Sequence, residues 1–358
     1  MQPRILFRTH YQVDEPAFAE VLIRRCTSAI ASAYNETVAE RLAKELQSRG
    51  KDFNVAAAAY ALDLARALGL LNENNVWTEK GHLVNLVAQV GDGGWESELA
   101  LTESERLLHF RLFLESDGAA LLFLARHVLT HGGIPNSEED WNSLAQELFV
   151  ETYSTYLTLT GPTADRVSLR TEIDRIKTKG YTGKSGPHKM FIHLQTLYRL
   201  GLVARGPEAG SRRYVVPPVD GAARLERFLT EVGDVLALEE IIQEHRLIDV
   251  AARVFQLSEK SAERPGPDGV LRILVPLYRR IMETGVSICP LSGLVESAQI
   301  GVLTAKSELL EYETALDLLR QAQHERMGDI RFHVDRRGRP AFLKLSDEIV
   351  EAFAPRAT

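Results

Sequence analysis

The sequence has few cysteines and no long hydrophobic run, and both features narrow the class of protein. Only two cysteines, Cys26 and Cys289, occur in 358 residues, so a disulfide framework and a cysteine-rich zinc site are excluded. The longest uncharged apolar run, residues 119–125, is far shorter than the roughly 20 residues that span a bilayer. The N-terminus lacks the apolar core of a secretory signal. We therefore expect a cytoplasmic protein with no membrane segment.

The motifs of common enzymes are also missing. Residues 183–185 (Gly-Lys-Ser) resemble the end of a Walker A loop, but that motif needs a glycine at position 178, where the sequence has threonine. His127 and His131 are one helical turn apart, yet the sequence shows no third zinc ligand. We expect a non-enzymatic protein without cofactor or metal. A catalytic pair of carboxylates stays open, because one sequence does not place its many carboxylates in space.

The charge of the chain is distributed unevenly. The net charge is −7, but residues 1–163 carry −9, residues 164–214 carry +7 and residues 215–358 carry −5. Phosphate attraction acts over about 8–10 Å at physiological salt, so one basic surface on an acidic protein is enough for a nucleic-acid site. The simpler alternative is a solvated basic face that contacts an acidic neighbour.

Apolar residues recur at helical spacing through most of the chain. Asp117 and Gly118 interrupt one long apolar helix, two helices are expected within residues 222–257, and residues 258–269 resemble a linker. Apolar and polar residues alternate within 330–345 on both sides of a turn, which predicts a hairpin. The fold class is therefore mainly α with small β-hairpins.

One order of elements recurs three times: helix, turn, helix and a short two-stranded hairpin. The copies cover about residues 36–86, 164–216 and 270–346. The first copy leaves its second helix through Leu-Gly-Leu-Leu (68–71) and ends with Thr-Glu-Lys-Gly (78–81). The second copy leaves its second helix through Leu-Tyr-Arg-Leu-Gly-Leu-Val, after which a Gly/Pro loop joins two short strands.

These features resemble the winged helix-turn-helix superfamily, over about half of the chain. The resemblance implies several winged-helix-like units joined by helical segments. We predict an N-terminal helical domain (1–160), a basic winged-helix domain (161–218) and a C-terminal helical domain (219–358). The first and last domains each contain one further unit.

The middle copy carries most of the residues that we expect to contact nucleic acid. In a helix-turn-helix, the N-terminal residues of the second helix contact base edges in the major groove. Phosphate contacts position such a unit, and base contacts specify sequence. We assign Lys189 and His193 to base edges, although an exposed or capping imidazole is the simpler interpretation of each histidine. The predicted residues are Lys177, Lys179, Lys184, Ser185, His188, Lys189, His193, Arg199, Arg205, Arg212 and Arg213.

The other two copies differ in charge. The third has Arg336, Arg337 and Arg339 at its hairpin turn, where arginine can enter a narrow minor groove; an ordinary solvated turn is the alternative. The first lacks a basic face. We interpret the acidic N-terminal region as a surface for protein partners or for a homo-oligomer.

Two functions follow from these observations. The first is a non-enzymatic duplex-DNA-binding protein, such as a transcription regulator, that acts mainly through its basic middle unit. The alternative is a protein-docking subunit of a complex for DNA processing, chromosome maintenance or antiviral defence.

Overall fold

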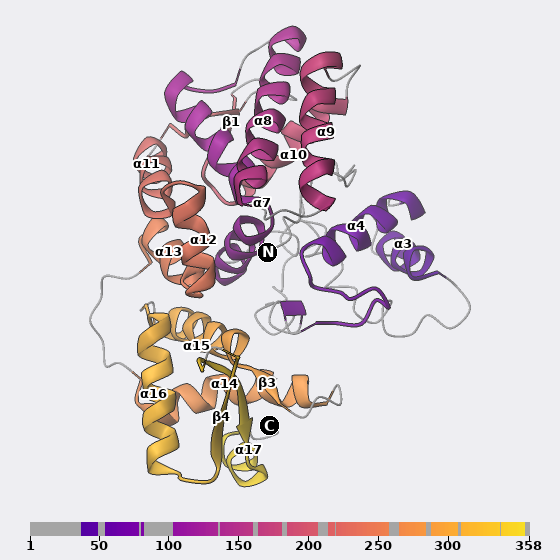
Figure 1. The fold of residues 1–358 in the computed structure, drawn as a ribbon. Coiled ribbons are helices and arrows are strands. Elements are labelled where there is room, and N and C mark those ends of the chain that lie inside the picture. The colour runs from indigo at the N-terminus through magenta and orange to yellow at the C-terminus, as the bar shows by residue number, and fades with distance from the viewer. Residues whose placement is uncertain are drawn as a thin grey trace.

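The described part of the computed structural model is mainly helical, with two small antiparallel sheets, which confirms the prediction of a mainly α protein with little β structure. Figure 1 shows three groups of elements: α3 and α4, then α7 to α13 with β1 and β2, and α14 to α17 with β3 to β5. Among the described helices, none is both long enough and apolar enough to cross a membrane. The structure describes residues 37–48, 54–78, 80–81, 103–134, 137–159, 164–180, 185–206, 214–218, 220–257, 265–283, 288–306, 309–336 and 338–354.

The first group is a helix pair followed by a tight turn. Helices α3 (Val38–Ser48) and α4 (Val55–Ala67) pack together, and the small side chains of α4 allow a close approach. A single antiparallel bridge between Leu71 and Trp77 closes the turn after α4. The hairpin predicted for the first copy is therefore reduced to one bridge among the described residues.

Helix α7 (Glu103–His131) is the centre of the second group and packs against α8, α10, α11, α12 and α13. Asp117 has φ −149° and ψ 34°, so the helix kinks there, as the sequence predicts. The neighbouring helices are α8 (Glu138–Leu159), α9 (Ala164–Lys179) and α10 (Ser185–Arg199).

Residues 222–257 lie in three helices rather than the two predicted. They are α11 (Gly221–Val232), α12 (Val235–Gln243) and α13 (Leu247–Val254). The first break follows from Gly233, with φ +72°, and from the Asp234 side chain, which accepts a hydrogen bond from the Ala237 N–H at 2.9 Å. The second break follows from the positive φ of His245. Two predicted helices allow for one break, so the sequence reasoning missed the other.

A small sheet joins the end of α7 to the segment that follows α10. Strands β1 (Ala204–Arg205) and β2 (Tyr214–Val215) pair antiparallel. Gly133, just after α7, bridges to Val215, and the Ile134 N–H donates to the Tyr214 carbonyl at 3.0 Å. Helix α8 packs on α9 and α10. Elements from α7 to β2 therefore pack together on both sides of residue 160, where we placed the end of the N-terminal domain.

The C-terminal unit contains helix, strand, two helices and a hairpin, in that order. Its strands lie in the order β3-β5-β4, all antiparallel, and the hairpin predicted at residues 330–345 is present. The elements are α14 (Pro267–Met282), β3 (Cys289–Pro290), α15 (Leu291–Lys306), α16 (Tyr312–Glu325), β4 (Ile330–Val334), β5 (Pro340–Leu345) and α17 (Asp347–Phe353).

Candidate nucleic-acid interface

Two of the predicted lysines lie at the C-terminal end of α9. Lys177 and Lys179 are exposed on its last turn, where a cation complements the partial negative charge of the helix end. Gly180 ends the helix with φ +62°, and its N–H donates to the Ile176 carbonyl at 2.8 Å. Both lysines are thus accessible to an anion.

The next helix, α10, is largely buried. His193 and Thr196 are each only 5% exposed, and Lys189 is half-buried. None of the α10 residues whose side chains the structure describes is fully exposed. The prediction that His193 lies on an outer face with access to base edges is therefore wrong, and we do not propose it as a contact residue.

His193 is buried because it pairs with Asp117 at the kink of α7. Its Nε2 hydrogen-bonds to Asp117 Oδ2, and both side chains are buried. Its Nδ1 lies 2.9 Å from the Lys189 carbonyl oxygen, and because a carbonyl only accepts, Nδ1 carries a proton. The hydrogen bond between Nε2 and Oδ2 needs a further proton on one of these two atoms. Burial raises the pKa of Asp117, and the neighbouring His193 opposes this shift.

An aromatic cluster holds two arginines at the other end of α10. The guanidinium carbons of Arg199 and Arg205 lie 5.7 and 5.2 Å from the centre of the Tyr198 ring, within the range of a cation–π contact. Tyr198 in turn meets Tyr214 edge-on at 6.4 Å between ring centres. Burial raises the pKa of Tyr214, and the charge of Arg205 opposes this. Both arginines are half-buried.

The cations of the middle unit therefore form two groups rather than one continuous helix face. Helix α10 has 15 residues, so at 1.5 Å per residue its ends are about 21 Å apart. Arg199 and Arg205 lie at its C-terminal end, whereas Lys177 and Lys179 precede its N-terminal end in the chain. Lys184, Arg212 and Arg213 lie outside the described residues, as do the side chains of Ser185 and His188.

The hairpin of the C-terminal unit is more accessible. Arg336 and Arg339 are exposed at its tip, and Arg337 lies outside the described residues. The Asp335 side chain accepts a hydrogen bond from the Arg339 N–H at 2.9 Å, and Gly338 has φ +77°. The tip is therefore a tight turn built by Asp335 and Gly338, in which the side chains of Arg336 and Arg339 are exposed.

Sequence reasoning missed two further cations on this hairpin. Arg331 on β4 lies directly opposite Lys344 on β5, and both side chains are exposed. The alternation in β4 showed that Arg331 points outward, but the pairing of the two strands was needed to bring Lys344 beside it. Like charges directly opposite each other destabilise an antiparallel pair, so this arrangement favours an anion as ligand.

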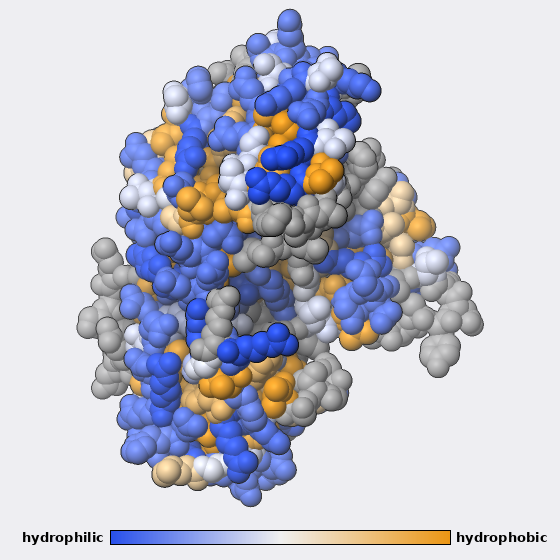
Figure 2. All heavy atoms as spheres, in the orientation of Figure 1, coloured by the Kyte–Doolittle hydropathy of each residue, from blue (hydrophilic) through white to orange (hydrophobic). Residues whose placement is uncertain are grey.

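The hairpin as a whole is strongly basic. Residues 330–345 contain five Lys or Arg and one acidic residue, Asp335. Within the described part of the chain, Arg331, Arg336, Arg339 and Lys344 form no ion pair. On the face shown in Figure 2, hydrophilic side chains surround small hydrophobic areas of the C-terminal unit, at the bottom of the view.

Helix α16, next to the hairpin in the chain, has the opposite charge. Residues 311–325 contain four Asp or Glu and one Arg, and Glu311, Glu313, Asp317 and Glu325 are exposed. Arg320 pairs with Asp317 at 2.8 Å. This helix would repel phosphate.

An ionic cluster with a buried centre, also missed from the sequence, joins the three groups of elements. Arg111 on α7 pairs with Glu296 on α15 at 3.0 Å, and both side chains are buried. Glu115, one turn after Arg111, pairs with Lys80 of the first group at 2.6 Å. Burial raises the pKa of Glu296, and Arg111 opposes the shift. The charged partners lie on segments far apart in the sequence, so no local sequence pattern indicates that they pair. Only the folded chain brings these side chains together.

A second buried carboxylate fastens the C-terminal unit to α13. Asp249 Oδ1 accepts hydrogen bonds from Gln299 Nε2 at 2.5 Å and from the Tyr312 N–H at 3.2 Å. Asp249 is 4% exposed, and burial raises its pKa to about 6. The two carboxylates, Asp249 and Glu296, therefore hold the C-terminal unit against the middle group.

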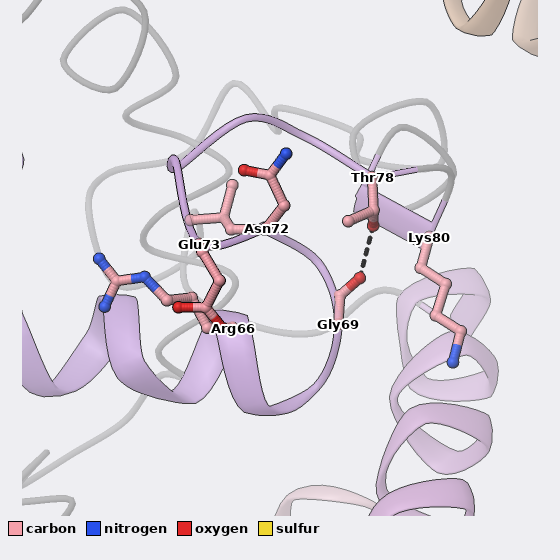
Figure 3. Close-up of a pocket in the computed structure, with 7 residues that line it drawn as sticks. Arg66, Gly69, Asn72, Glu73, Thr78 and Lys80 are labelled. Atoms are coloured by element: carbon pink, nitrogen blue, oxygen red, sulfur yellow. Dashed lines mark hydrogen bonds between the residues drawn. The ribbon is translucent and has the colours of Figure 1, made fainter. Parts of the chain in front are cut away.

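The first group contains a pocket of about 440 Å³ (Figure 3). Its cations are already engaged: Lys80 pairs with Glu115, and Arg66 bonds to Asp63 and Asn75. Thr78 Oγ donates to the Gly69 carbonyl and accepts from the Gly81 N–H at 3.2 Å, which closes the turn. The lining residues are Arg66, Gly69, Leu71, Asn72, Glu73, Thr78 and Lys80.

The two histidines at the end of α7 contact each other. The rings of His127 and His131 stack with centres 4.3 Å apart, and His131 Nδ1 bonds to the His127 carbonyl at 3.0 Å. In the described part of the chain, no group of three or more His, Cys, Asp or Glu side chains is arranged to hold a metal ion.

Comparisons of this chain with protein families, with curated proteins and with solved structures find no match. The functional argument therefore rests on the geometry above.

Proposed function

We propose that the protein binds duplex DNA through backbone phosphates, using winged-helix-like units. The observation that carries the proposal is the β4–β5 hairpin with four exposed cations, none of which forms an ion pair with another described residue. Phosphate contacts supply the larger part of nonspecific DNA affinity. The exposed lysines at the end of α9 add a second basic group.

The topology of the C-terminal unit supports this proposal. Its helix, strand, two helices and hairpin, with strand order β3-β5-β4, resemble the arrangement of a winged helix-turn-helix unit. In such a unit the hairpin is the wing, which lies beside the second of the paired helices. We infer that this wing, rather than α10 of the middle unit, is the main DNA-binding element.

Fluorescence anisotropy with a labelled 30-base-pair duplex tests the proposal. The logarithm of the association constant should fall linearly with the logarithm of the salt concentration. Each lost phosphate contact should reduce the steepness of that line by about 0.9. Arg336→Glu with Arg339→Glu should weaken binding at least tenfold, and Lys177→Glu with Lys179→Glu should weaken it less. Arg272→Glu, which reverses an exposed charge on α14, is the matched control. Wild-type protein that binds no duplex at low salt would refute the proposal.

A second candidate function is docking of a protein partner, and the acidic exposed side of α16 favours it. The partner would carry a basic surface. A native mass measurement on the protein isolated from its source cell separates the two: a stable complex with another protein supports docking, and a chain that is alone or self-associated supports DNA binding.

A further inference from the structure

We propose that the C-terminal unit places the outer face of the β4–β5 hairpin in the DNA major groove, and that α16 does not contact the duplex. This inference rests on the proposed function. It goes further by naming the groove and the four side chains that face it: Arg331, His333, Phe342 and Lys344.

The two faces of the hairpin have different roles. On the inner face, Ile330, Leu343 and Leu345 are buried in the core. On the outer face, Arg331 is paired with Lys344 and His333 with Phe342, through the register of the two strands. Arg331, His333 and Lys344 are exposed and Phe342 is half-buried. The outer face therefore presents two adjacent cross-strand pairs to the solvent.

The side chains on this face match the chemistry of the major groove. Arg and Lys bond to the O6 and N7 acceptors of guanine, and an apolar side chain such as Phe contacts the methyl group of thymine. The Arg331–Lys344 pair is unfavourable as an isolated pair of like charges, and a guanine edge or a phosphate between them would remove that cost. Arg331 Nε donates to the Gly328 carbonyl at 3.1 Å, which limits its conformational freedom.

The dimensions of the hairpin also fit the major groove. Paired strands are about 4.8 Å apart, and each residue advances about 3.3 Å, so β4 extends about 13 Å from Ile330 to Val334, and Arg336 lies beyond it in the turn. The major groove is about 12 Å wide and admits a two-stranded ribbon, whereas the minor groove is about 6 Å wide. On the other edge of β5, β3 adds only the two residues Cys289 and Pro290 to the sheet. The minor groove would admit only the side chains at the tip.

The charge of α16 argues against the usual docking mode, in which the second of the paired helices enters the groove. A recognition helix contacts base edges with its N-terminal residues. In α16 these positions include Glu311 and Glu313, both exposed, and a carboxylate beside phosphate is repelled. Of α16 and the hairpin, the hairpin is thus the element with the charge to approach DNA.

Modified duplexes test the inference with the full-length chain. One duplex contains guanine, and its counterpart contains 7-deazaguanine, which removes the N7 acceptor from the major groove and leaves the minor groove unchanged. Wild-type protein should bind the 7-deazaguanine duplex about tenfold more weakly. Arg331→Ala with Lys344→Ala should bind the normal duplex at least tenfold more weakly and should no longer distinguish the two duplexes.

The controls separate this inference from the proposed function. Glu313→Ala, on α16, should not weaken binding, and Arg336→Ala with Arg339→Ala should weaken binding to both duplexes equally. Thermal unfolding followed by circular dichroism checks that each variant folds. Equal wild-type affinity for the two duplexes, or displacement of the protein by netropsin in the minor groove, would overturn the major-groove assignment alone. A wild-type chain that binds neither duplex would overturn the proposed function as well.

Discussion

Helix α10 and the β4–β5 hairpin were both expected to contact nucleic acid, but α10 is largely buried and one face of the hairpin is exposed. Helix α10 packs against α7 and α8, and its His193 is buried in a pair with Asp117. The hairpin has one face in the core and the other exposed, with Arg331 and Lys344 on the exposed face. A basic segment is therefore a binding surface only where packing leaves it accessible. The comparison separates residues that should affect stability from residues that should affect binding.

The largest expected effect is a loss of stability from a change in the buried helix α10. His193→Ala should lower the free energy of unfolding by about 3–5 kcal/mol, because it leaves the Asp117 carboxyl buried without its partner. Urea denaturation measures the loss. Gln195→Ala, a half-buried position of the same helix, should cost less than about 1 kcal/mol. If His193→Ala were as stable as the Gln195 variant, the Asp117–His193 pair would not be what holds α10 in place.

The attachment of the hairpin-bearing unit should depend on pH. Because burial raises the pKa of Asp249 to about 6 from its ordinary 3.8, the folded chain holds this proton more tightly than the unfolded chain. The contribution of the Asp249 proton to the free energy of unfolding is largest below about pH 4. It decreases as the pH rises toward 6, and the free energy of unfolding stays lower above that pH. The difference is about 3 kcal/mol.

Asp249→Asn removes this dependence and keeps the acceptor oxygen for Gln299 and Tyr312. The variant should be more stable than the wild type at pH 7, and the two should converge near pH 4. Denaturation across this range gives the comparison. Asp249→Ala, which leaves the buried Tyr312 N–H without an acceptor, should be less stable throughout. An Asn variant with the wild-type pH profile would contradict the shifted pKa.

The turn in the first group extends the comparison to the first of the three copies. A Cβ added at Gly81 would lie 2.3 Å from the Leu70 carbonyl oxygen and 2.4 Å from the Trp77 ring. Gly81→Ala should therefore cost about 1–3 kcal/mol through overpacking. Gly132→Ala provides a contrast, since its Cβ would meet no atom within 4 Å and its cost comes from φ +73° alone. Limited proteolysis and thermal unfolding would show whether the damage is confined to the first group.

The smallest effect on stability is expected for changes at the exposed tip of the β4–β5 hairpin. Arg336→Ala with Arg339→Ala should change the free energy of unfolding by less than about 0.5 kcal/mol, because both side chains are exposed surface residues. The same variant should lose about two units of salt slope in DNA binding. Stability that fell as far as in the His193 variant would show that the tip is structural, and the distinction between the two regions would fail.

Local patterns predicted much of the fold. Alternation within residues 330–345 predicted the hairpin, and Asp117 with Gly118 predicted the interruption of α7, because both signals depend only on neighbouring residues. The same reasoning placed His193 on an outer face, since helical spacing shows which residues share a face but not which face meets another helix. It also missed the Arg111–Glu296 pair, whose members are 185 positions apart in the sequence.

The sequence by itself determined the mainly helical class, the hairpins and the concentration of positive charge near the middle of the chain. Only the tertiary structure decided which cations remain in water. Burial depends on contacts between segments that are distant in the chain, such as Asp117 with His193. The strand register that places Arg331 opposite Lys344 likewise exists only after β4 and β5 have paired.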